Sequence, residues 1–388
     1  MIYLGNCLDV LQTLAAESID SIVTDPPYGL GFMGKEWDHS VPGAPFWEAM
    51  LRVAKPGAYL AAFGGTRTFH RMACAIEDAG WELRDTLMWV YGSGFPKSHN
   101  GEWGGTALKP AWEPIILARK PLVGTVEANW RQHGTGALNI DGCRVEGIAE
   151  RPGTTPPSAG ERGSMSGDLP RQNYEPDQQG RWPANVLHDG SCEVISAFPN
   201  APGQIANASS SRMRKTQNVY GAMSCGNGRD GEASQESENA GAVGFNMKPG
   251  ARRGDAGSAA RFFYCAKASK ADRDDGLDAH PVVVTDVLAG HRSRRMEEVK
   301  RPDGATPSVG RNNHPTVKPT DLMRWLCRLV TPPGGHVLDP FTGSGSTGRA
   351  AVMEGMRFTG IELDPEYVAI AEARIRAAQP GLSFGDAA

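Results

Sequence analysis

The chain has 388 residues, and at roughly 150 residues per domain this length predicts two to three domains. Its 40 Lys and Arg residues against 44 Asp and Glu residues give a net charge of -4, which excludes a protein that binds nucleic acid through bulk positive charge. The 48 glycines and 28 prolines make up about a fifth of the chain, so much of it is expected to form turns and loops.

Short strand-like and helix-like segments alternate over the first 120 residues, which is typical of an α/β layer architecture. The helical spacing of Leu8, Leu11 and Leu14 predicts the first helix. The other elements predicted in this part are strands over 19–24, 58–63, 83–90 and 115–118 and helices over 46–54 and 68–79.

Residues 121–260 break this alternation, because they are rich in Gly, Pro, Ser, Asn and Arg and poor in large apolar residues. Within them, 209–258 has the composition of a segment that becomes ordered only with a partner. We therefore expect one α/β core, formed by 1–120 and 261–388, that is split by an irregular insert carrying the specificity. The elements predicted after the insert are strands over 261–265, 337–338 and 358–361 and helices over 320–330, 346–354 and 365–377.

The cysteines and the N-terminus bear on the compartment. The seven cysteines are odd in number and contain no C-x-x-C pair, so neither a disulfide framework nor a zinc site is indicated. The N-terminus lacks a basic segment followed by an apolar one, and no apolar run reaches the roughly 18 residues of a membrane span. We expect a soluble, cytoplasmic protein with no metal site and no membrane partner.

A glycine-rich turn, Asp339–Gly345, follows the predicted strand 337–338 and leads into a helix, so that Gly343, Gly345 and Gly348 fit the pattern G-x-G-x-x-G. Glycine allows a ligand to approach the backbone, and a helix N-terminus offers free N–H groups. Glu362 ends the next predicted strand, where a carboxylate can accept both hydroxyls of a ribose. The turn indicates a nucleoside-bearing cofactor; the alternative is a tight turn without a ligand. It lacks the Lys of a P-loop, which disfavours a nucleotide triphosphatase.

A second turn, Asp25-Pro26-Pro27-Tyr28, follows the predicted strand 19–24. Ligands bind at this end of strands in open α/β sheets, and proline restricts the backbone and removes N–H donors. The turn can present a carboxylate and a carbonyl to one amino group, with Tyr28 stacked on the ring that carries it. This suits the exocyclic amine of a nucleobase, whose lone pair must be localised before it attacks an electrophile. The alternative is a proline-stiffened surface turn with a buried Tyr28.

In this order the two turns resemble the motifs of the amino-group DNA methyltransferases that use S-adenosylmethionine, in the β-class permutation, where D-P-P-Y precedes the specificity region and F-x-G-x-G comes last. Asn313–Pro319 is similar to the family's element before the cofactor strand, and the resemblance covers 1–120 and 260–388. It implies a circularly permuted, Rossmann-like class I methyltransferase sheet, with 121–260 as an inserted target-recognition region. The finer resemblance is to phage and prophage-type members, in residues 92–98, 112–121 and 261–275.

The resemblance also implies roles for single residues. Asp25 and the Pro26 carbonyl would accept hydrogen bonds from the target amine, and Tyr28 would stack on a base flipped out of the duplex. The methyl group would move by direct displacement, and the chain has no Pro-Cys dipeptide of the kind that C5-cytosine methyltransferases need. The implied catalytic residues are Asp25, Pro26, Pro27 and Tyr28, and the implied cofactor residues are Asn6, Cys7, Thr316, Lys318, Asp339, Phe341, Thr342, Gly343, Gly345 and Glu362.

Within the implied cofactor site, Glu362 would hold the ribose, and Thr316 and Lys318 would meet the carboxylate. Asp339 would orient the amino group, with a cap role as its alternative. Phe341, Gly343 and Gly345 would line the methionine part, while His314 is expected to be structural rather than a base.

One position departs from the family pattern. Members usually carry Gly-Asp-Cys near the N-terminus, whereas this chain has Gly5-Asn6-Cys7. Asn6 can still accept a hydrogen bond from the cofactor's adenine through its side-chain oxygen, but without a charge. A lower cofactor affinity is therefore expected.

The target base and the DNA surface are less directly indicated. In this family Asp at the position of Asp25 usually accompanies N6-adenine chemistry and Ser accompanies N4-cytosine, so adenine is favoured and cytosine is the alternative. The basic segment 290–330 could follow phosphates, or it could be a solvated loop and helix face. Residues 29–45 are expected to form a lid. The residues expected to contact DNA are Lys35, Lys97, Ser98, His99, Arg292 and Arg294.

Double-stranded DNA is thus the expected partner, while a homodimer, a cognate restriction endonuclease, an orphan regulatory role and phage self-protection all stay open. Three other readings also stay open. The acceptor could be RNA or a protein glutamine amide, the glycine turn could serve a nicotinamide-dependent oxidoreductase, or the cofactor site could have decayed in a DNA-binding protein.

Overall fold

The computed structural model describes residues 1–30, 39–94, 101–147, 180–200, 257–266, 271–284 and 309–379. Two compact units divide the chain: one comprises Met1–Cys143, Pro183–Val194 and Phe263–Ala388, the other Arg144–Trp182 and Ile195–Phe262. The first unit therefore includes parts of the segment 121–260. The expected DNA contacts lie outside the described residues, as do residues 31–38 of the expected lid and 209–256; these contacts are Lys35, Lys97, Ser98, His99, Arg292 and Arg294.

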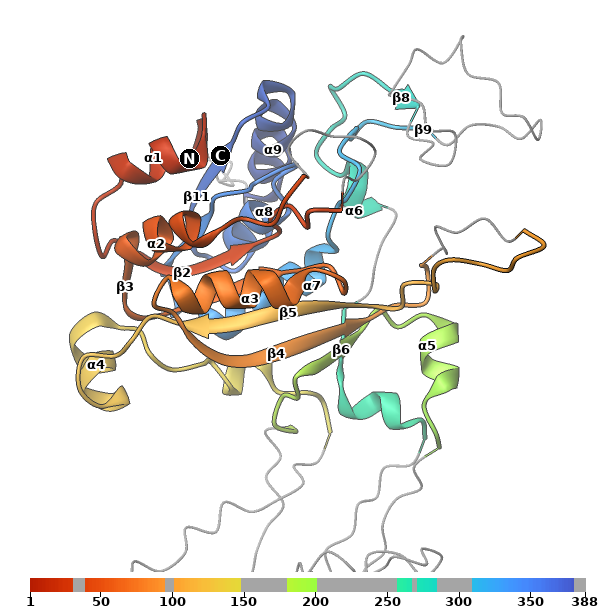
Figure 1. The fold of residues 1–388 in the computed structure, drawn as a ribbon, viewed down its shortest axis with the longest axis horizontal. Coiled ribbons are helices and arrows are strands. Elements are labelled where there is room, and N and C mark those ends of the chain that lie inside the picture. Colours follow the sequence, from red (N-terminus) through yellow and green to blue (C-terminus); the bar gives the residue numbers. More distant parts are fainter. Residues whose placement is uncertain are drawn as a thin grey trace, which may run out of the picture. The chain divides into compact units, whose positions relative to one another are not determined.

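A nine-stranded sheet in the order β1-β11-β10-β2-β3-β5-β4-β6-β7 forms the centre of the first unit as described (Figure 1). Its strands are β1 (Ile2–Leu4), β2 (Ile19–Thr24), β3 (Ala54–Phe63), β4 (Glu82–Val90), β5 (Trp112–Arg119), β6 (Val186–His188), β7 (Tyr264–Cys265), β10 (His336–Asp339) and β11 (Arg357–Glu362). A separate antiparallel pair joins β8 (Val283–Val284) to β9 (Val309–Gly310).

The two ends of the chain complete one sheet. Strands β1, β11, β10, β2 and β3 are mutually parallel, and β5 then runs antiparallel to both β3 and β4. Strands β10 and β11 lie between β1 and β2, and the register pairs Val337 with Ser21 and Leu338 with Ile22. All six residues of β2 are buried, including Asp20, Ser21 and Thr24, as expected for a central strand covered on both faces. The predicted permuted α/β sheet is confirmed.

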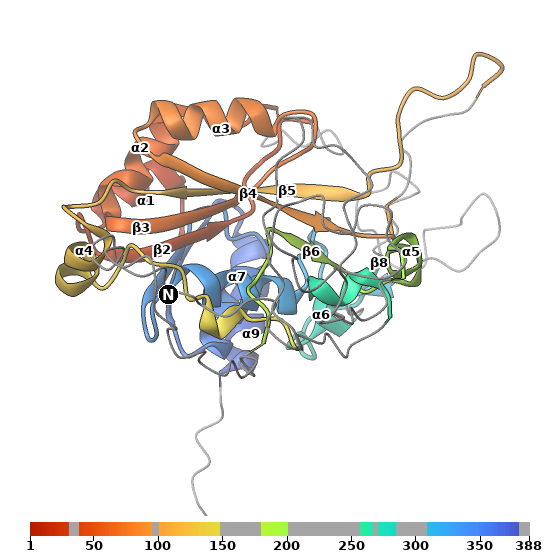
Figure 2. The same cartoon turned by 90° about the horizontal axis from the view of Figure 1, so that it is seen from below.

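Helices cover both faces of this sheet (Figure 2). One face carries α1 (Cys7–Thr13), α2 (Ala44–Val53) and α3 (Phe69–Asp78), and the other carries α7 (Thr320–Val330), α8 (Ser346–Met353) and α9 (Pro365–Ala378). The remaining α-helices of the described residues are α4 (Val126–His133), α5 (Cys192–Ala197) and α6 (Ala271–Asp274).

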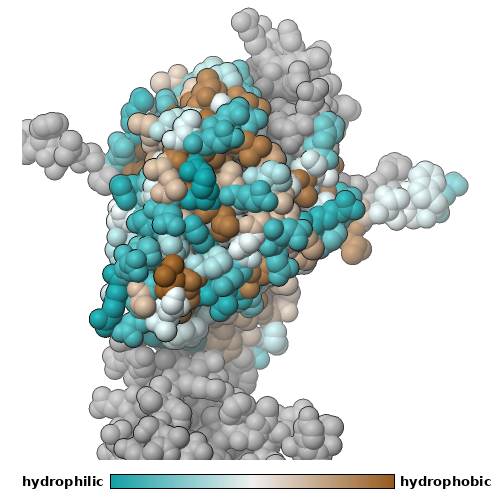
Figure 3. Space-filling model, turned by 60° about the vertical axis from the view of Figure 1, so that its left-hand side comes forward, coloured by the Kyte–Doolittle hydropathy of each residue, from teal (hydrophilic) through white to brown (hydrophobic). Residues whose placement is uncertain are grey.

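Each face of the sheet has its own hydrophobic core, because neighbouring strand residues point to opposite sides. Val23 packs in the cluster that includes Trp325 of α7, whereas Ile22 packs in the cluster that includes Trp47 of α2. Eight of the eleven residues of α7 are buried, and this helix packs on β2 and β3. On the surface shown in Figure 3, hydrophilic residues surround small hydrophobic patches.

The core elements predicted from the sequence are confirmed, with bounds that shift by a few residues, whereas β1 and, within 121–260, α4, β6 and α5 were not predicted. Helix α4 is weakly apolar, yet it is held by a side-chain cap at Thr125 and a left-handed Gly134, and β6 is too short for a clear pattern. The predicted strand 261–265 was wrong at its start, since Ala259–Phe262 forms a 3₁₀ turn and the strand begins at Tyr264. No helix in the described ranges is long and apolar enough to cross a membrane.

Candidate active site

The site lies where β2 and β10 run side by side. From this pair the strand order proceeds outward in both directions, through β3 on one side and β11 on the other, and open α/β sheets bind ligands at such a switch point. The two turns singled out in the sequence follow these two strands. The hydroxyl of Thr24, the last residue of β2, donates to Asp339 Oδ1 at 2.7 Å, so the two turns start from one buried contact.

A cavity of about 1490 Å³ opens at this point. Ligand pockets usually measure roughly 300–1,000 Å³, so the cavity has room for two groups rather than one. It is lined by both turns and by the segment before β10. Of the expected site residues, the wall contains Asn6, Cys7, Asp25, Pro26, Pro27, Tyr28, Thr316, Lys318, Asp339, Phe341, Thr342, Gly343 and Glu362.

Gly345 lies behind the wall rather than in it. It has φ +80° at the N-cap of α8, and a Cβ there would lie 2.8 Å from the Ala371 Cβ. Glycine is needed for the backbone conformation and for the close packing of α8 against α9. Gly345 therefore shapes the turn from behind.

At the front of the glycine turn, Gly343 and Glu362 line the cavity. Gly343 has φ +53°, and a Cβ there would lie 2.8 Å from His314 Nε2. Its N–H donates to Glu362 Oε2 at 2.7 Å, while Glu362 Oε1 accepts from the N–H groups of Leu363 and Asp364 at 2.9 Å. Burial raises the pKa of Glu362, and these N–H donors oppose the rise. A carboxylate held in this way keeps acceptor capacity for hydroxyl groups on its cavity side.

Asp339 organises the turn from within. It is buried, and its carboxylate accepts hydrogen bonds from the Thr24 hydroxyl, the Phe341 N–H at 3.1 Å and the Thr347 hydroxyl at 2.6 Å. Burial raises its pKa to about 6, although these three donors act in the opposite direction. The Thr342 hydroxyl donates to the Asp339 carbonyl at 2.9 Å. These contacts join the strand ends and the turn, whereas the sequence predicted a cofactor contact with a cap role as its alternative.

His314 supports the turn as a neutral ring. Its Nδ1 lies 2.6 Å from the Thr316 carbonyl oxygen, and its ring meets that of Tyr367 edge-on at 4.6 Å between centroids. Burial lowers its pKa to about 4, so the ring carries no charge near neutral pH. This placement supports a structural role.

The N-terminal wall is formed by Asn6 and Cys7. Asn6 caps α1, since its side-chain oxygen accepts from the Leu8 N–H at 2.9 Å. Burial raises the pKa of the Cys7 thiol to about 11, so it stays a neutral group. Phe341 closes the wall near them, with its ring 6.2 Å from that of Phe46 in α2.

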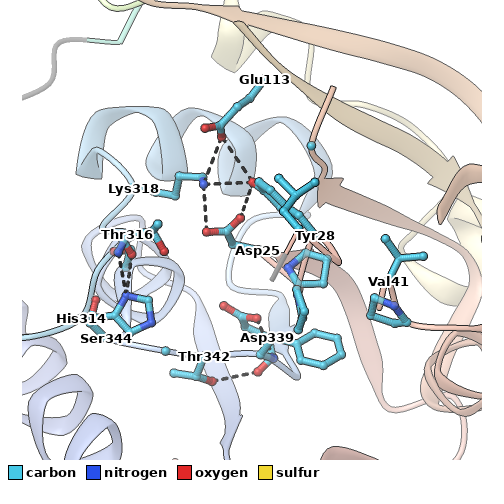
Figure 4. A pocket seen from close by; sticks show the side chains of 18 of the residues that line it. Asp25, Tyr28, Val41, Glu113, His314, Thr316, Lys318, Asp339, Thr342 and Ser344 are labelled. Atoms are coloured by element: carbon cyan, nitrogen blue, oxygen red, sulfur yellow. Dashed lines mark hydrogen bonds and ion pairs between the residues drawn. The ribbon is translucent and has the colours of Figure 1, made fainter. Parts of the chain in front are cut away.

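The Asp25–Tyr28 turn carries a closed cluster of charges (Figure 4). The Tyr28 hydroxyl donates to Asp25 Oδ1 at 2.7 Å, and Lys318 Nζ lies 2.9 Å from Asp25 Oδ2, 3.1 Å from Glu113 Oε2 and 3.1 Å from the Tyr28 oxygen. The side chain of Lys318 is only 8% exposed. Burial alone would lower its pKa, but the carboxylates of Asp25 and Glu113 outweigh burial and raise it. Burial, with the same two carboxylates, keeps the pKa of Tyr28 well above its usual range.

Two features of this cluster differ from what the sequence suggested. Lys318 was expected at a cofactor carboxylate, and in the structure its ammonium group lies against the turn of Asp25. Glu113 was not singled out at all, because the predicted strand began at residue 115. The signal that could have marked it is a charged residue at the start of an apolar run, two residues before Ile115.

Comparison with known proteins agrees with this geometry. Residues 19–373 match the family model N6_N4_Mtase, described as DNA methylase. The chain is 42% identical over 78 residues to a protein of Escherichia coli strain K12 named as the methylase YubD, a match that covers 20% of this chain and 34% of that protein. It is 45% identical over 64 residues to the type II methyltransferase M2.DpnII of Streptococcus pneumoniae, covering 16% of this chain and 24% of that one. The matches thus span about a third or less of these curated relatives.

Solved structures with a similar fold are methyltransferases as well. The PvuII DNA methyltransferase, described as cytosine-N4-specific, has a TM-score of 0.44 and 16% identity and covers 96% of this chain and 85% of its own. The M1.HpyAVI–SAM complex has a TM-score of 0.41 and 15% identity and covers 97% of this chain and 98% of its own. Because these scores are low, the assignment depends on the family match and on the geometry of the chain itself.

Proposed function

The chain belongs to the N6/N4 DNA methylase family, whose model matches residues 19–373, and from that premise we propose that it transfers a methyl group from S-adenosylmethionine to the exocyclic N6 amine of adenine in duplex DNA. The observation that carries the proposal is that the turns of Asp25 and Gly343 start from adjacent strands and open into one cavity. A methyl donor on one turn would thereby face an amine on the other.

The residues of the glycine turn suit this donor. Glu362, held by three backbone N–H groups, would accept the ribose hydroxyls, and Gly343 lets the turn pass close to the His314 ring at the cavity wall. Phe341 would pack on the methionine part, and Asn6 would meet the adenine ring through its amide. When bound, S-adenosylmethionine supplies a methyl group activated by its sulfonium charge.

The residues of the Asp25 turn would prepare the amine. Asp25 and the Pro26 carbonyl would accept its two N–H hydrogens, which localises the nitrogen lone pair toward the methyl carbon. The nitrogen forms the new bond to this carbon as the sulfur–methyl bond breaks, and one proton of the amine then passes to water. Tyr28 would stack on the base, which must leave the duplex to reach this cavity.

The choice of adenine is based on Asp25, since an acid at this position goes with N6-adenine chemistry in the family. The N4 amine of cytosine is the second candidate, because it also stands next to a ring nitrogen. The insert would read the target sequence, and the protein would act in the cytoplasm, alone or beside a restriction endonuclease. Identifying the methylated base and its flanking sequence would test the choice of adenine and the role of the insert.

The experiment that tests the proposal is methyl transfer from tritiated S-adenosylmethionine to unmethylated duplex DNA, followed by digestion to nucleosides. Label in N6-methyladenine that is lost in Asp25→Ala supports the proposal. Label in N4-methylcytosine keeps the mechanism and refutes the choice of base. Absence of label in DNA, with S-adenosylhomocysteine still raising the melting temperature, refutes DNA as the substrate.

A further inference from the structure

The charge cluster at the Asp25 turn contains more groups than methyl transfer by an Asp-Pro-Pro-Tyr turn requires. The turn needs a carboxylate, a carbonyl and an aromatic ring, whereas the structure adds a buried lysine and a second carboxylate. Burying a lysine is costly unless it is paired, and Lys318 is paired twice. The following inference rests on the proposed function of this same site.

We infer that Lys318 and Glu113 are positioning residues for Asp25: Lys318 holds the Asp25 carboxylate in one orientation, and Glu113 balances the lysine so that the cluster stays net negative. Asp25 Oδ2 takes the ammonium of Lys318 and Oδ1 takes the Tyr28 hydroxyl. Each oxygen has a second lone pair, so the carboxylate is held on two sides and can still accept an amine N–H.

The balance of charge explains why Glu113 is present. Asp25 and Lys318 alone would sum to zero, and Glu113, 3.1 Å from the same ammonium, brings the cluster to one negative charge. The amine nitrogen becomes positive as it takes the methyl group, and a preorganised negative environment stabilises that charge. A neutral cluster would lack this effect, and two carboxylates without the lysine would repel each other until one bound a proton.

Two titratable neighbours of the cluster, Tyr91 and His314, add no charge to it. Burial raises the pKa of Tyr91, near Glu113 and Lys318, to about 12, so it stays neutral. His314 stays neutral because burial lowers its pKa to about 4. Asp339 repels Asp25 from the neighbouring strand end, with its own pKa raised to about 6 mainly by burial. The cations Arg67 and Lys109 also line the cavity.

The test compares Lys318→Met, Glu113→Gln and the double variant by the pH dependence of single-turnover methyl transfer. Lys318→Met should lower the rate by about 10- to 100-fold and move the acid limb up by about one pH unit or more, because the two carboxylates then share a site. Glu113→Gln should move the acid limb in the opposite direction. The double variant removes one positive and one negative charge beside Asp25, so it should return the limb toward the wild-type position.

The control is Lys55→Met, which removes a lysine–aspartate pair of 2.5 Å at the other end of β2 and should leave the limb unchanged.

Two outcomes would overturn the inference. One is an acid limb that none of the three variants moves. The other is a Lys318→Met effect confined to the KM for S-adenosylmethionine, which would place Lys318 at the cofactor carboxylate instead.

A second readout separates this inference from the proposed function. Without Lys318 the paired carboxylates destabilise the fold most when both are ionised, so the Tm gap between wild type and Lys318→Met should be larger at pH 8 than at pH 5. If the wild-type protein methylates no DNA, the proposed function fails, while a Tm gap that changes with pH in this way still supports the cluster. A gap that does not change with pH counts against it.

Discussion

The hydroxyl of Thr24 donates a hydrogen bond of 2.7 Å to the carboxylate of Asp339, a residue 315 positions away, and both side chains are buried. This bond joins the ends of β2 and β10, where the two turns of the site begin. Together with the backbone pairing of β2 and β10, this contact sets the relative position of the amine-binding turn and the glycine turn.

Replacing Thr24 by Val should destabilise the protein, because Val has the same shape and leaves the buried Asp339 Oδ1 with the longer hydrogen bond from the Phe341 N–H alone. The expected loss is about 1–3 kcal/mol in the free energy of unfolding, measured with a chemical denaturant. The control is Thr13→Val, whose hydroxyl bonds to a carbonyl at an exposed helix end. An equal loss of unfolding free energy in both variants would show that the buried Thr24–Asp339 bond stabilises the fold no more than an exposed hydroxyl bond does.

Asp339 should make stability depend on pH. Burial raises its pKa to about 6, whereas an unfolded Asp ionises near about 3.9, so the native state keeps a proton that the unfolded chain has lost. Its ionisation therefore lowers stability as the pH rises from about 4 to about 6. Relative to Asp339→Asn, the wild type should lose about 2–3 kcal/mol of unfolding free energy over this range, and the difference should stay constant at higher pH. Unfolding curves across the range decide this, and a flat difference would contradict it.

Gly343→Ala should weaken cofactor binding beyond its effect on stability. Gly343 and Gly334 both have a left-handed backbone, with φ +53° and +68°, but only at Gly343 would a Cβ meet another group, His314. Both variants should lose about 1–2 kcal/mol from the backbone alone. Only Gly343→Ala should also weaken S-adenosylhomocysteine binding, by about 10-fold or more, as measured by calorimetry. Equal S-adenosylhomocysteine affinities in the two variants would show that the turn of Gly343 is not part of the cofactor site.

Glu362→Gln should likewise lower cofactor affinity, by about 10-fold, because an amide has one acceptor oxygen in place of two. The matched control is Glu354→Gln at the end of α8. There the carboxylate pairs with Arg324 and Arg328 of α7. That control should reduce stability and leave cofactor affinity unchanged. An unchanged cofactor affinity in Glu362→Gln would show that Glu362 only braces the loop.

The sequence by itself determined the elements and turns whose signals are local. The short strand pattern of Ile19–Thr24 before the Asp25 turn and the helical spacing of α7 predicted the bounds of β2 and α7 as observed. The motif residues Asp25–Tyr28 and Phe341–Gly343 were also found, because each motif is contiguous in the chain and follows a predicted strand.

Only the tertiary structure decided which distant side chains meet. Glu113 stands in β5 and Lys318 precedes α7, and neither lies within a turn motif that would mark its direction. They reach Asp25 because β3 alone separates β2 from β5 in the sheet and because α7 packs on β2 and β3. Sheet order and helix packing place charges that are far apart in the chain around one buried ammonium, and no local pattern of residues contains that information.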